Sequence, residues 1–214
     1  MSHALKVLLK IIHNRISSKC EANIGDDQFG FRSGMGTREA LFSLLVLAQK
    51  CYDQQRDIFI CFIDFEKAFD RVRHDLMESL RGVGLDGKDI TLIQNLYWNQ
   101  RARIRIEGSI SEQIGIGRRV RQGCVLSPLL FNLYSELIFD RSLADISEGV
   151  KINGVNVNSI RYADDTVLIA DSDEGLQRLL NSVSNTCNEF GMKINVKKTK
   201  VMIIKKSKNV PQPI

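Results

Sequence analysis

No apolar run in this 214-residue sequence approaches the roughly 18 residues that a membrane-spanning helix needs, so we expect no contact with a membrane. Histidine is scarce, and its three copies have spacings that match no zinc finger. The five cysteines form no CxxC pair, and several lie in apolar stretches. This usage predicts buried thiols in a reducing compartment rather than disulfides or a structural zinc site.

Acidic residues are missing from both ends of the chain. Residues 1–20 contain none and are amphipathic and basic, a pattern shared by mitochondrial transit peptides and by helices that pack on a core. We favour the helix, because the segment reads as continuous with the domain. No acidic residue follows Glu189, and seven lysines lie between Lys193 and Lys208. This basic run is either a solvated surface or a surface that faces phosphate groups.

The rest of the composition is that of a globular protein, with 43% hydrophobic and 26% charged residues. A net charge of +5 and a pI near 9.0 favour an anionic partner. The length fits one large domain or two small lobes, and no low-complexity linker marks a boundary.

The apolar pattern predicts helices and strands that alternate along the chain, which is typical of an α+β domain. Helices are expected at residues 4–17, 37–51, 74–82, 87–99, 128–147 and 173–190. Strands are expected at 58–64, 101–108, 160–170 and 201–204, with an Asn-Gly hairpin at 152–157. The strand at 101–108 alternates basic and apolar residues, which predicts one wet, positive face.

Three aspartates lie where these elements end. Asp64 closes the apolar strand at 58–64, whereas Asp164 and Asp165 lie in a tight turn between two strand segments. If the strands pair, the three carboxylates converge, and carboxylates of this kind hold two divalent cations over a transferring phosphoryl group. Because side chains alternate between the faces of a strand, we do not expect Asp164 and Asp165 to contribute equally.

Five motifs follow one another in a fixed order. They are FGFRSGMGT at 29–37, FIDFEKAFD at 62–70, RQGCVLSP at 121–128, YADD at 162–165 and GMKINVKKTK at 191–200. Each motif alone is weak, since a pair of aspartates in a turn is usually only a polar turn. Together, in this order and at these intervals, they resemble the reverse transcriptase domain of non-LTR (LINE-type) retrotransposons, from about residue 3 to 205.

The resemblance implies an α+β, right-hand polymerase fold, with the palm and part of the fingers present and the thumb absent. A reverse transcriptase domain is expected over residues 1–210, followed by a basic, proline-containing tail at 206–214. Within it, 1–57 and 75–120 are expected to be partly fingers, and 58–74 and 121–205 mainly palm.

The implied activity is RNA-directed DNA synthesis, in which a primer 3′-hydroxyl attacks the α-phosphate of a dNTP. The implied cofactors are two Mg²⁺ ions, for which Mn²⁺ can substitute. The implied partners are an RNA template, a DNA primer or target, and dNTPs. The expected location is intracellular, nuclear or cytoplasmic, with nuclear action implied by the family only.

Carried over to this sequence, Asp64 and Asp164 resemble the principal ligands of both metals. Asp165 resembles the weaker third carboxylate, and the backbone carbonyl of Phe65 a further metal contact. Phe69 resembles the residue that packs against the sugar and rejects a 2′-hydroxyl, although a core aromatic is the alternative.

The other motifs suggest contacts to substrate and template. Gln122 and Gly123 resemble residues that meet the incoming nucleotide. Ser127 and Pro128 resemble residues near the template, and they also suit a helix start. The backbone of FGFRSGMGT is a candidate phosphate contact, and Arg32 a candidate template or triphosphate contact, with a flexible glycine turn as the alternative. Lys198, in an N-x-x-K-T motif, is a candidate general acid for pyrophosphate, and Lys197 and Lys200 are its competitors.

Two hypotheses of different class remain open. One is a catalytic RNA-directed DNA polymerase domain. The other is a truncated element remnant that binds nucleic acid without polymerising. An intron maturase or an RNA-dependent RNA polymerase is disfavoured by YADD and by the LINE-like sequence of residues 121–135.

Overall fold

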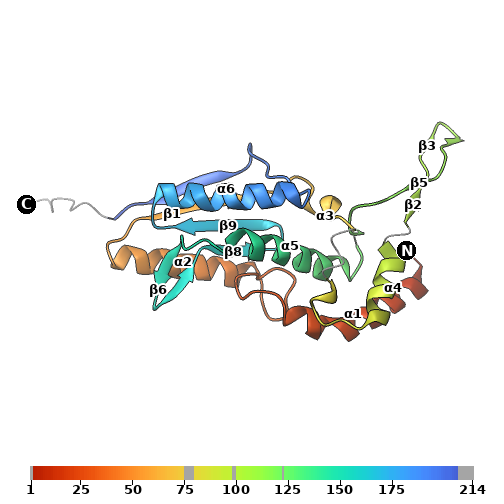
Figure 1. The fold of residues 1–214 in the computed structure, drawn as a ribbon, viewed down its shortest axis with the longest axis horizontal. Helices are drawn as coiled ribbons and strands as arrows, with labels where there is room; N and C mark the ends of the chain where they lie inside the picture. Colours follow the sequence, from red (N-terminus) through yellow and green to blue (C-terminus); the bar gives the residue numbers. More distant parts are fainter. Residues whose placement is uncertain (1, 75–79, 98–99, 122, 207–214) are drawn as a thin grey trace, which may run out of the picture. The chain divides into compact units, whose positions relative to one another are not determined.

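The computed structural model describes residues 2–74, 80–97, 100–121 and 123–206 (Figure 1). The chain forms two compact units. The ribbon unit comprises Met1–Ile24 and Lys67–Glu136, and the sheet unit comprises Gly25–Glu66 and Leu137–Ile214.

The described helices are α1 (His3–Glu21), α2 (Thr37–Asp53), α3 (Ala68–Arg71), α4 (Gly87–Tyr97), α5 (Ser127–Leu143) and α6 (Asp173–Glu189). The described strands are β1 (Ile58–Ile63), β2 (Arg101–Ala102), β3 (Arg105–Ile106), β4 (Ser109–Ile110), β5 (Ile114–Gly115), β6 (Val150–Ile152), β7 (Val155–Val157), β8 (Ser159–Tyr162), β9 (Asp165–Ala170) and β10 (Lys200–Ile204).

Most elements predicted from the apolar pattern are confirmed. The first helix extends to Glu21, and the short helix α3 was not predicted. The predicted helix at 74–82 falls largely on residues 75–79, which lie outside the described residues, as does most of the predicted tail at 206–214. Buried positions hold all five cysteines, which form no disulfide, as predicted. Among the described helices, none is both long and apolar enough to cross a membrane.

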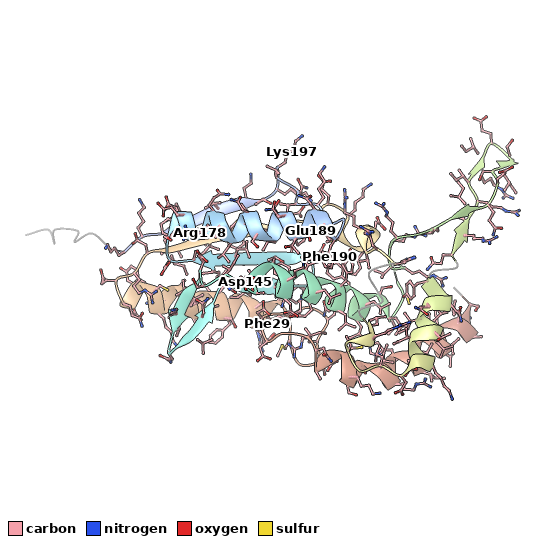
Figure 2. The ribbon with its side chains drawn as sticks, viewed as in Figure 1. Phe29, Asp145, Arg178, Glu189, Phe190 and Lys197 are labelled. Atoms are coloured by element: carbon pink, nitrogen blue, oxygen red, sulfur yellow. The ribbon has the colours of Figure 1, made fainter. Side chains whose placement is uncertain are left out.

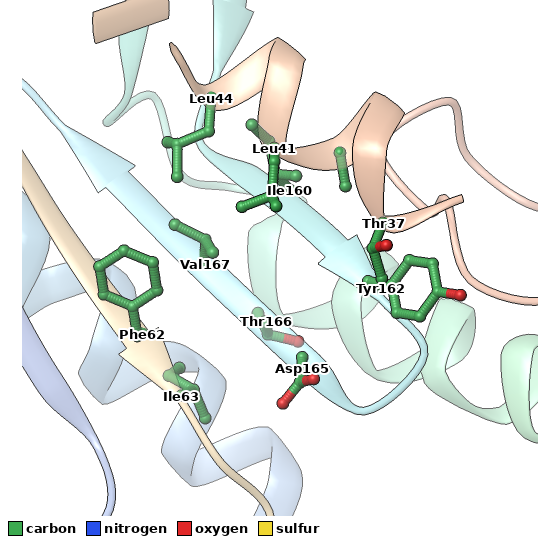
Figure 3. Close-up of a pocket in the computed structure, with 11 residues that line it drawn as sticks. Thr37, Leu41, Leu44, Phe62, Ile63, Ile160, Tyr162, Asp165, Thr166 and Val167 are labelled. Atoms are coloured by element: carbon green, nitrogen blue, oxygen red, sulfur yellow. The ribbon is translucent and has the colours of Figure 1, made fainter. Parts of the chain in front are cut away.

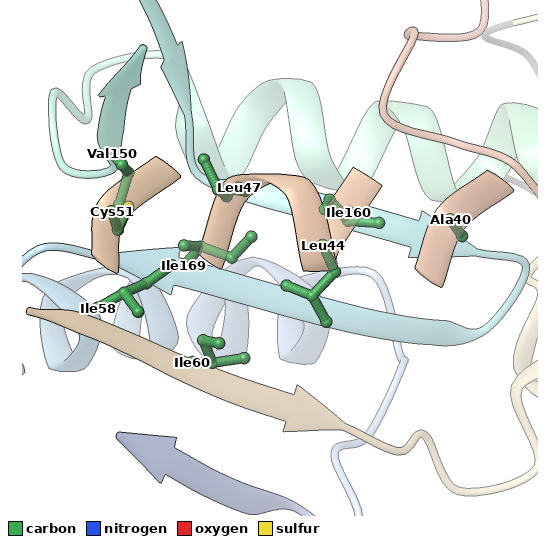
Figure 4. Close-up of a cluster of buried hydrophobic side chains, with 9 residues drawn as sticks. All are labelled: Ala40, Leu44, Leu47, Cys51, Ile58, Ile60, Val150, Ile160 and Ile169. Atoms are coloured by element: carbon green, nitrogen blue, oxygen red, sulfur yellow. The ribbon is translucent and has the colours of Figure 1, made fainter. Parts of the chain in front are cut away.

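The sheet unit is built on a four-stranded antiparallel sheet in the order β10-β1-β9-β8. Helices α2 and α6 cover its opposite faces, as the view past α2 shows (Figure 4). Buried side chains between α2 and the sheet form a core cluster: Ala40, Leu44, Leu47, Cys51, Ile58, Ile60, Val150, Ile160 and Ile169. Burying apolar side chains on both faces explains why β1 is a continuous apolar run.

Local signals fix the ends of these two helices. At the start of α2 the Glu39 carboxylate accepts a hydrogen bond from the Gly36 backbone N–H at 2.8 Å. At the start of α6 the Ser172 hydroxyl accepts one from Gly175 N–H at 3.2 Å. After α6, Gly191 has a φ of +74°, the conformation that ends helices and favours glycine.

The ribbon unit contains α1, α3, α4, the first part of α5 and a β-ribbon made of β2–β5. Arg15 on α1 forms an ion pair with the buried Asp89 on α4. The side chains of residues 101–115 are all exposed, so both faces of the ribbon are wet. The prediction of one wet, positive face is therefore incomplete. The opposite face, which carries Ile104 and Ile106, is exposed as well, because no described element covers it.

Candidate active site

Strand pairing brings the ends of two motifs together in the sheet unit. Strands β1 and β9 are antiparallel neighbours, with Ile63 opposite Thr166. Asp64 follows β1 directly, and Asp165 is the first residue of β9. An antiparallel pair places the end of one strand beside the start of the other, so Asp64 lies next to the YADD turn.

The YADD turn is a two-residue hairpin loop. Tyr162 of β8 pairs with Asp165 of β9, which leaves Ala163 and Asp164 as the loop. Ala163 has a φ of +59°, a left-handed conformation that costs an L-residue of order 1 kcal/mol. Asp164 is half-buried and Asp165 is exposed, so the two carboxylates occupy different environments.

Asp164 is affected by its burial and by the charges of the other two aspartates. Burial raises the pKa of Asp164, and the negative charges of Asp165 and Asp64 raise that pKa further. The strand pairing thus brings Asp64 and the YADD turn to the same end of the sheet, and a shared metal site of the three carboxylates stays a prediction. As the side chains stand, no three His, Cys, Asp or Glu residues within the described part of the chain are grouped closely enough to hold one metal ion.

The GMKINVKKTK motif lies against the same strand end. The Asn195 backbone N–H donates to the Asp64 carbonyl at 2.7 Å, and the Asn195 carbonyl accepts from the N–H groups of Lys198 and Thr199. This turn places Lys198 Nζ 3.4 Å from Asp64 Oδ1. Lys197 points away from the sheet and α6 (Figure 2). Lys198 is thus the lysine of this motif that forms an ion pair with Asp64.

Phe65 continues the pairing of these two segments. It forms an isolated antiparallel bridge with Ile194, and the N–H of Glu66 donates to the Lys193 carbonyl at 2.8 Å. The side chain of Phe65 is buried, with 8% of it exposed. Its backbone is therefore paired with the GMKINVKKTK segment beside Asp64, and the predicted contact of its carbonyl with a metal remains a prediction.

An apolar pocket of about 270 Å³ lies between α2 and the sheet and reaches Asp165 (Figure 3). Its lining residues are Thr37, Ala40, Leu41, Leu44, Phe62, Ile63, Ile160, Tyr162, Asp165, Thr166 and Val167. Tyr162 and Asp165, from the two strands of the YADD hairpin, contribute its polar atoms together with two threonines. The pocket puts apolar surface next to one of the three carboxylates.

The FGFRSGMGT segment is occupied with internal contacts. Arg32 Nη1 donates to the carbonyls of Gly25 and Gln28, at 2.8 and 3.2 Å, and so braces the loop before α2. The Phe29 N–H donates to the Arg161 carbonyl at 2.8 Å. These contacts explain why a glycine-rich loop is ordered here, and the predicted contact of Arg32 with template or triphosphate stays a prediction.

The remaining predicted site residues belong to the ribbon unit. Phe69 stacks on the buried Phe131, with ring centroids 4.5 Å apart. Gly123 has a φ of +74° at a turn, and Ser127 and Pro128 begin α5. Gln122 lies outside the described residues. The partly buried position of Phe69 agrees with the alternative of a core aromatic and leaves its predicted contact with the sugar untested.

Sequence reasoning missed the residue that braces the RQGCVLSP motif. The hydroxyl of the buried Tyr97 lies 3.2 Å from both Cys124 Sγ and Ser127 Oγ. Arg121 stacks over the Tyr97 ring and donates from Nη2 to the Leu96 carbonyl at 2.9 Å. Burial, with the Cys124 contact, raises the pKa of Tyr97, so its hydroxyl stays protonated and able to donate. No local pattern announces this contact, because Tyr97 lies at the end of another helix.

The ion pair of a buried arginine was also missed. Arg161 on β8 donates to both oxygens of the Asp27 carboxylate, at 2.8 and 2.5 Å, and Ser159 donates to the same group. Only 2% of the Arg161 side chain is exposed, and its guanidinium stacks on Phe139 at 4.7 Å. The sequence signal that could have predicted this pair is an arginine between two hydrophobic residues of a strand segment, because a buried arginine needs an acidic partner.

Comparison with known proteins agrees with this geometry. The family model described as reverse transcriptase (RNA-dependent DNA polymerase) matches residues 1–211. The chain is 29% identical over 197 residues to the retrovirus-related Pol polyprotein of the type-2 retrotransposable element R2DM from Drosophila melanogaster, covering 90% of this chain and 18% of that protein. It is 26% identical over 197 residues to the RNA-directed DNA polymerase from mobile element jockey of Drosophila funebris, covering 90% and 21%. The chain thus spans about a fifth of the length of these relatives.

Solved structures show the same fold. Apo telomerase from Candida tropicalis, truncated from its C-terminal domain, superposes with a TM-score of 0.71 at 14% identity, covering 94% of this chain and 41% of that one. The expected right-hand polymerase fold is confirmed. The resemblance to non-LTR elements is confirmed too, because the relatives include R2 and jockey proteins. The chain belongs to the reverse transcriptase (RNA-dependent DNA polymerase) family.

Proposed function

We propose that this chain carries the catalytic centre of a LINE-type RNA-directed DNA polymerase, with Asp64, Asp164 and Asp165 as its metal-binding carboxylates. The observation that carries the proposal is the pairing of β1 with β9, which sets Asp64 beside the YADD turn. Burial and the negative charges of Asp165 and Asp64 raise the pKa of Asp164, so the ionised form of Asp164 is unfavourable there unless a cation balances it.

The donor set fits divalent cations in its chemistry. Mg²⁺ and Mn²⁺ prefer oxygen ligands, and all three side chains are carboxylates at adjacent strand ends. Asp64 and Asp164 would be the principal ligands, with Asp165 as a third and the Phe65 carbonyl as a further ligand. Two such cations, when bound, lower the pKa of the primer 3′-hydroxyl and neutralise the triphosphate.

The protein's own residues orient the reactants and move one proton. Lys198 Nζ, already 3.4 Å from Asp64 Oδ1, is the lysine that we assign to protonate the departing pyrophosphate. In this proposal Phe69 packs against the sugar of the incoming dNTP, and Gln122 and Gly123 meet the nucleotide. Arg32 contacts the template or the triphosphate, and Ser127 and Pro128 lie near the template.

The partners in this proposal are an RNA template, a DNA primer or target, and dNTPs. The exposed lysines after Glu189 supply positive charge for a phosphate backbone, because Lys193, Lys197 and Lys200 all have exposed side chains. We place the reaction inside the cell, in the nucleus or cytoplasm.

Primer extension tests the proposed function. Purified wild-type protein and Asp64→Ala would be incubated with a poly(rA)/oligo(dT) duplex, dTTP and either Mg²⁺ or Mn²⁺. We expect extension by wild type and a loss of at least about 100-fold in Asp64→Ala. Asp171→Ala removes a half-exposed aspartate of the same unit, after β9, and is the matched control.

Equal extension by wild type and Asp64→Ala would show that a contaminating polymerase or a different site is responsible. A folded wild-type protein that binds the duplex but never extends it would support the truncated remnant instead. Adding Mn²⁺ separates a weak metal site from a missing one, since Mn²⁺ generally binds such ligands more tightly than Mg²⁺.

A further inference from the structure

A buried glutamine holds the backbone of the YADD turn. No part of the Gln28 residue is exposed to solvent. Its Oε1 accepts hydrogen bonds from the backbone N–H groups of Ala163 and Gly30, each at 2.8 Å. Its Nε2 donates to the Ala163 carbonyl at 3.3 Å. One side-chain amide thus binds both backbone polar groups of the first residue of the turn.

The partners fix the orientation of this amide. A backbone N–H can only donate and a carbonyl can only accept, so the oxygen of Gln28 must face the two N–H groups. The backbones of Gly30 and Ala163 also lie in close contact, because a Cβ added to Gly30 would lie 2.2 Å from Ala163 N. Glycine is therefore required at position 30 by the approach of the turn itself.

The segment that carries Gln28 is itself attached to β8. Gln28 forms a parallel bridge with Arg161, whose N–H donates to the Asp27 carbonyl at 2.7 Å and whose carbonyl accepts from Phe29 N–H at 2.8 Å. The Asp27 carboxylate also binds the Arg161 side chain. Residues 27–29 are thus joined to β8 by one parallel bridge, next to the YADD turn.

The turn needs such support because its backbone is unfavourable. Ala163 lies at a φ of +59°, where glycine or asparagine is the usual residue. A strained residue persists only when its surroundings hold it, and relaxation of Ala163 would rotate the next peptide and redirect Asp164.

We propose that Gln28 is a positioning residue for the Asp164–Asp165 carboxylates: its amide, with the close packing of Gly30, fixes the Ala163 backbone and thereby the direction of both side chains. This inference rests on the proposed function, because positioning matters only if these carboxylates bind cations. Gln28 is fully buried and its amide oxygen accepts a hydrogen bond from the Gly30 N–H, so in this proposal both residues act through the turn.

Two variants of the full chain test this role. Gln28→Met keeps the size of the side chain but removes all three hydrogen bonds. Gly30→Ala leaves Gln28 in place and pushes on Ala163 through its new Cβ, so it carries the test if Gln28→Met does not fold. The Mn²⁺ dissociation constant of each would be measured by calorimetric titration, which needs no catalytic turnover. We expect it to rise about 10- to 100-fold in both, the usual effect of removing the support of metal ligands.

Controls separate positioning from loss of stability. Leu179→Ala empties space in the core under α6, where the leucine is fully buried, and Gln49→Met makes the same chemical change as Gln28→Met on the exposed face of α2. Both are expected to keep the wild-type Mn²⁺ affinity within about twofold, although Leu179→Ala lowers the melting temperature. Amide exchange at Ala163, which needs no metal, should accelerate in Gln28→Met and not in Gln49→Met.

Two outcomes contradict different claims. Saturable Mn²⁺ binding by wild type with unchanged affinity in both Gln28→Met and Gly30→Ala would overturn the positioning role and leave the proposed function standing. If the folded wild-type protein binds no Mn²⁺ at millimolar concentration, the metal site fails and the positioning role fails with it.

Discussion

Lys198 Nζ lies 3.4 Å from Asp64 Oδ1, and this contact joins two motifs that are 134 residues apart in the sequence. The turn stabilised by the Asn195 carbonyl creates it, because that carbonyl binds the N–H groups of Lys198 and Thr199. Among the lysines of the motif, Lys197 points elsewhere and Lys200 is the first residue of β10.

Replacing Lys198 should therefore impair catalysis more than replacing its neighbour. We expect Lys198→Ala to lower the rate of nucleotide incorporation by about 100-fold, the usual contribution of a general acid, and Lys197→Ala to change it little. Single-turnover primer extension across pH distinguishes the two. If Lys197→Ala is the slower variant, the assignment of the proton donor is wrong.

Asp164→Asn should stabilise the protein in the absence of metal at neutral pH. The pKa of Asp164 is raised above its ordinary value of 3.8, first by burial and then by its acidic neighbours. The native state of wild type therefore keeps its full stability below that ordinary value and loses part of it as pH rises through the raised pKa. The stability gain of the variant should be near zero at acidic pH and fully present at pH 7.

Thermal unfolding in EDTA between about pH 3 and 7.5 measures this difference. Asp173→Asn is the control, because the pKa of that exposed carboxylate is lowered, mainly by hydrogen bonds to Glu174, so its stability contribution has the opposite sign. If Asp164→Asn melts below wild type at pH 7, the ionised Asp164 carboxylate does not destabilise the native state.

Asp27→Ala should destabilise the sheet unit by about 3 kcal/mol, because it removes the carboxylate partner of a buried arginine. Its neighbour Asp26 is exposed, so Asp26→Ala should change the free energy of unfolding by no more than about 0.5 kcal/mol. Urea denaturation of both variants gives the comparison. Equal effects would indicate that the Asp27–Arg161 pair contributes no more than a surface charge.

The exposed lysines near the C-terminal strand should contribute to nucleic-acid affinity through charge. Replacing Lys197 and Lys200 together by alanine is expected to reduce the slope of log affinity for RNA against log salt by about 1.5. Lys50 and Lys88, which are exposed elsewhere, form the control pair. An unchanged slope in Lys197→Ala/Lys200→Ala would show that these lysines do not contact RNA and belong to a solvated surface.

Local patterns in the sequence were sufficient for the elements that carry the carboxylates. The run IFICFI predicted β1 because a strand covered on both faces is apolar throughout, and the strand-like segments on either side of the YADD turn predicted the hairpin. Both elements depend on residues close together in the chain. The same holds for α2 and α6, because the hydrogen bond that caps each helix joins two residues only three positions apart.

Long-range contacts were beyond such patterns. Gln28 meets Ala163 across 135 residues, and Tyr97 meets Ser127 from the end of a different helix. A polar residue in a turn-rich loop gives no sign that its amide will be buried. In the ribbon at 101–115 a local pattern was misleading. The alternation of basic and apolar residues indicated that one face is covered, whereas both faces are exposed in the structure.

Crystals of the wild-type protein grown or soaked with Mn²⁺ would test the central claim most directly, because anomalous scattering locates that ion without reference to activity. We expect Mn²⁺ bound between the carboxylates of Asp64 and Asp164, with Lys198 Nζ displaced from Asp64, and no such peak in Asp64→Ala. Mn²⁺ bound only elsewhere, at full occupancy in both proteins, would contradict the assignment of these aspartates as the metal site.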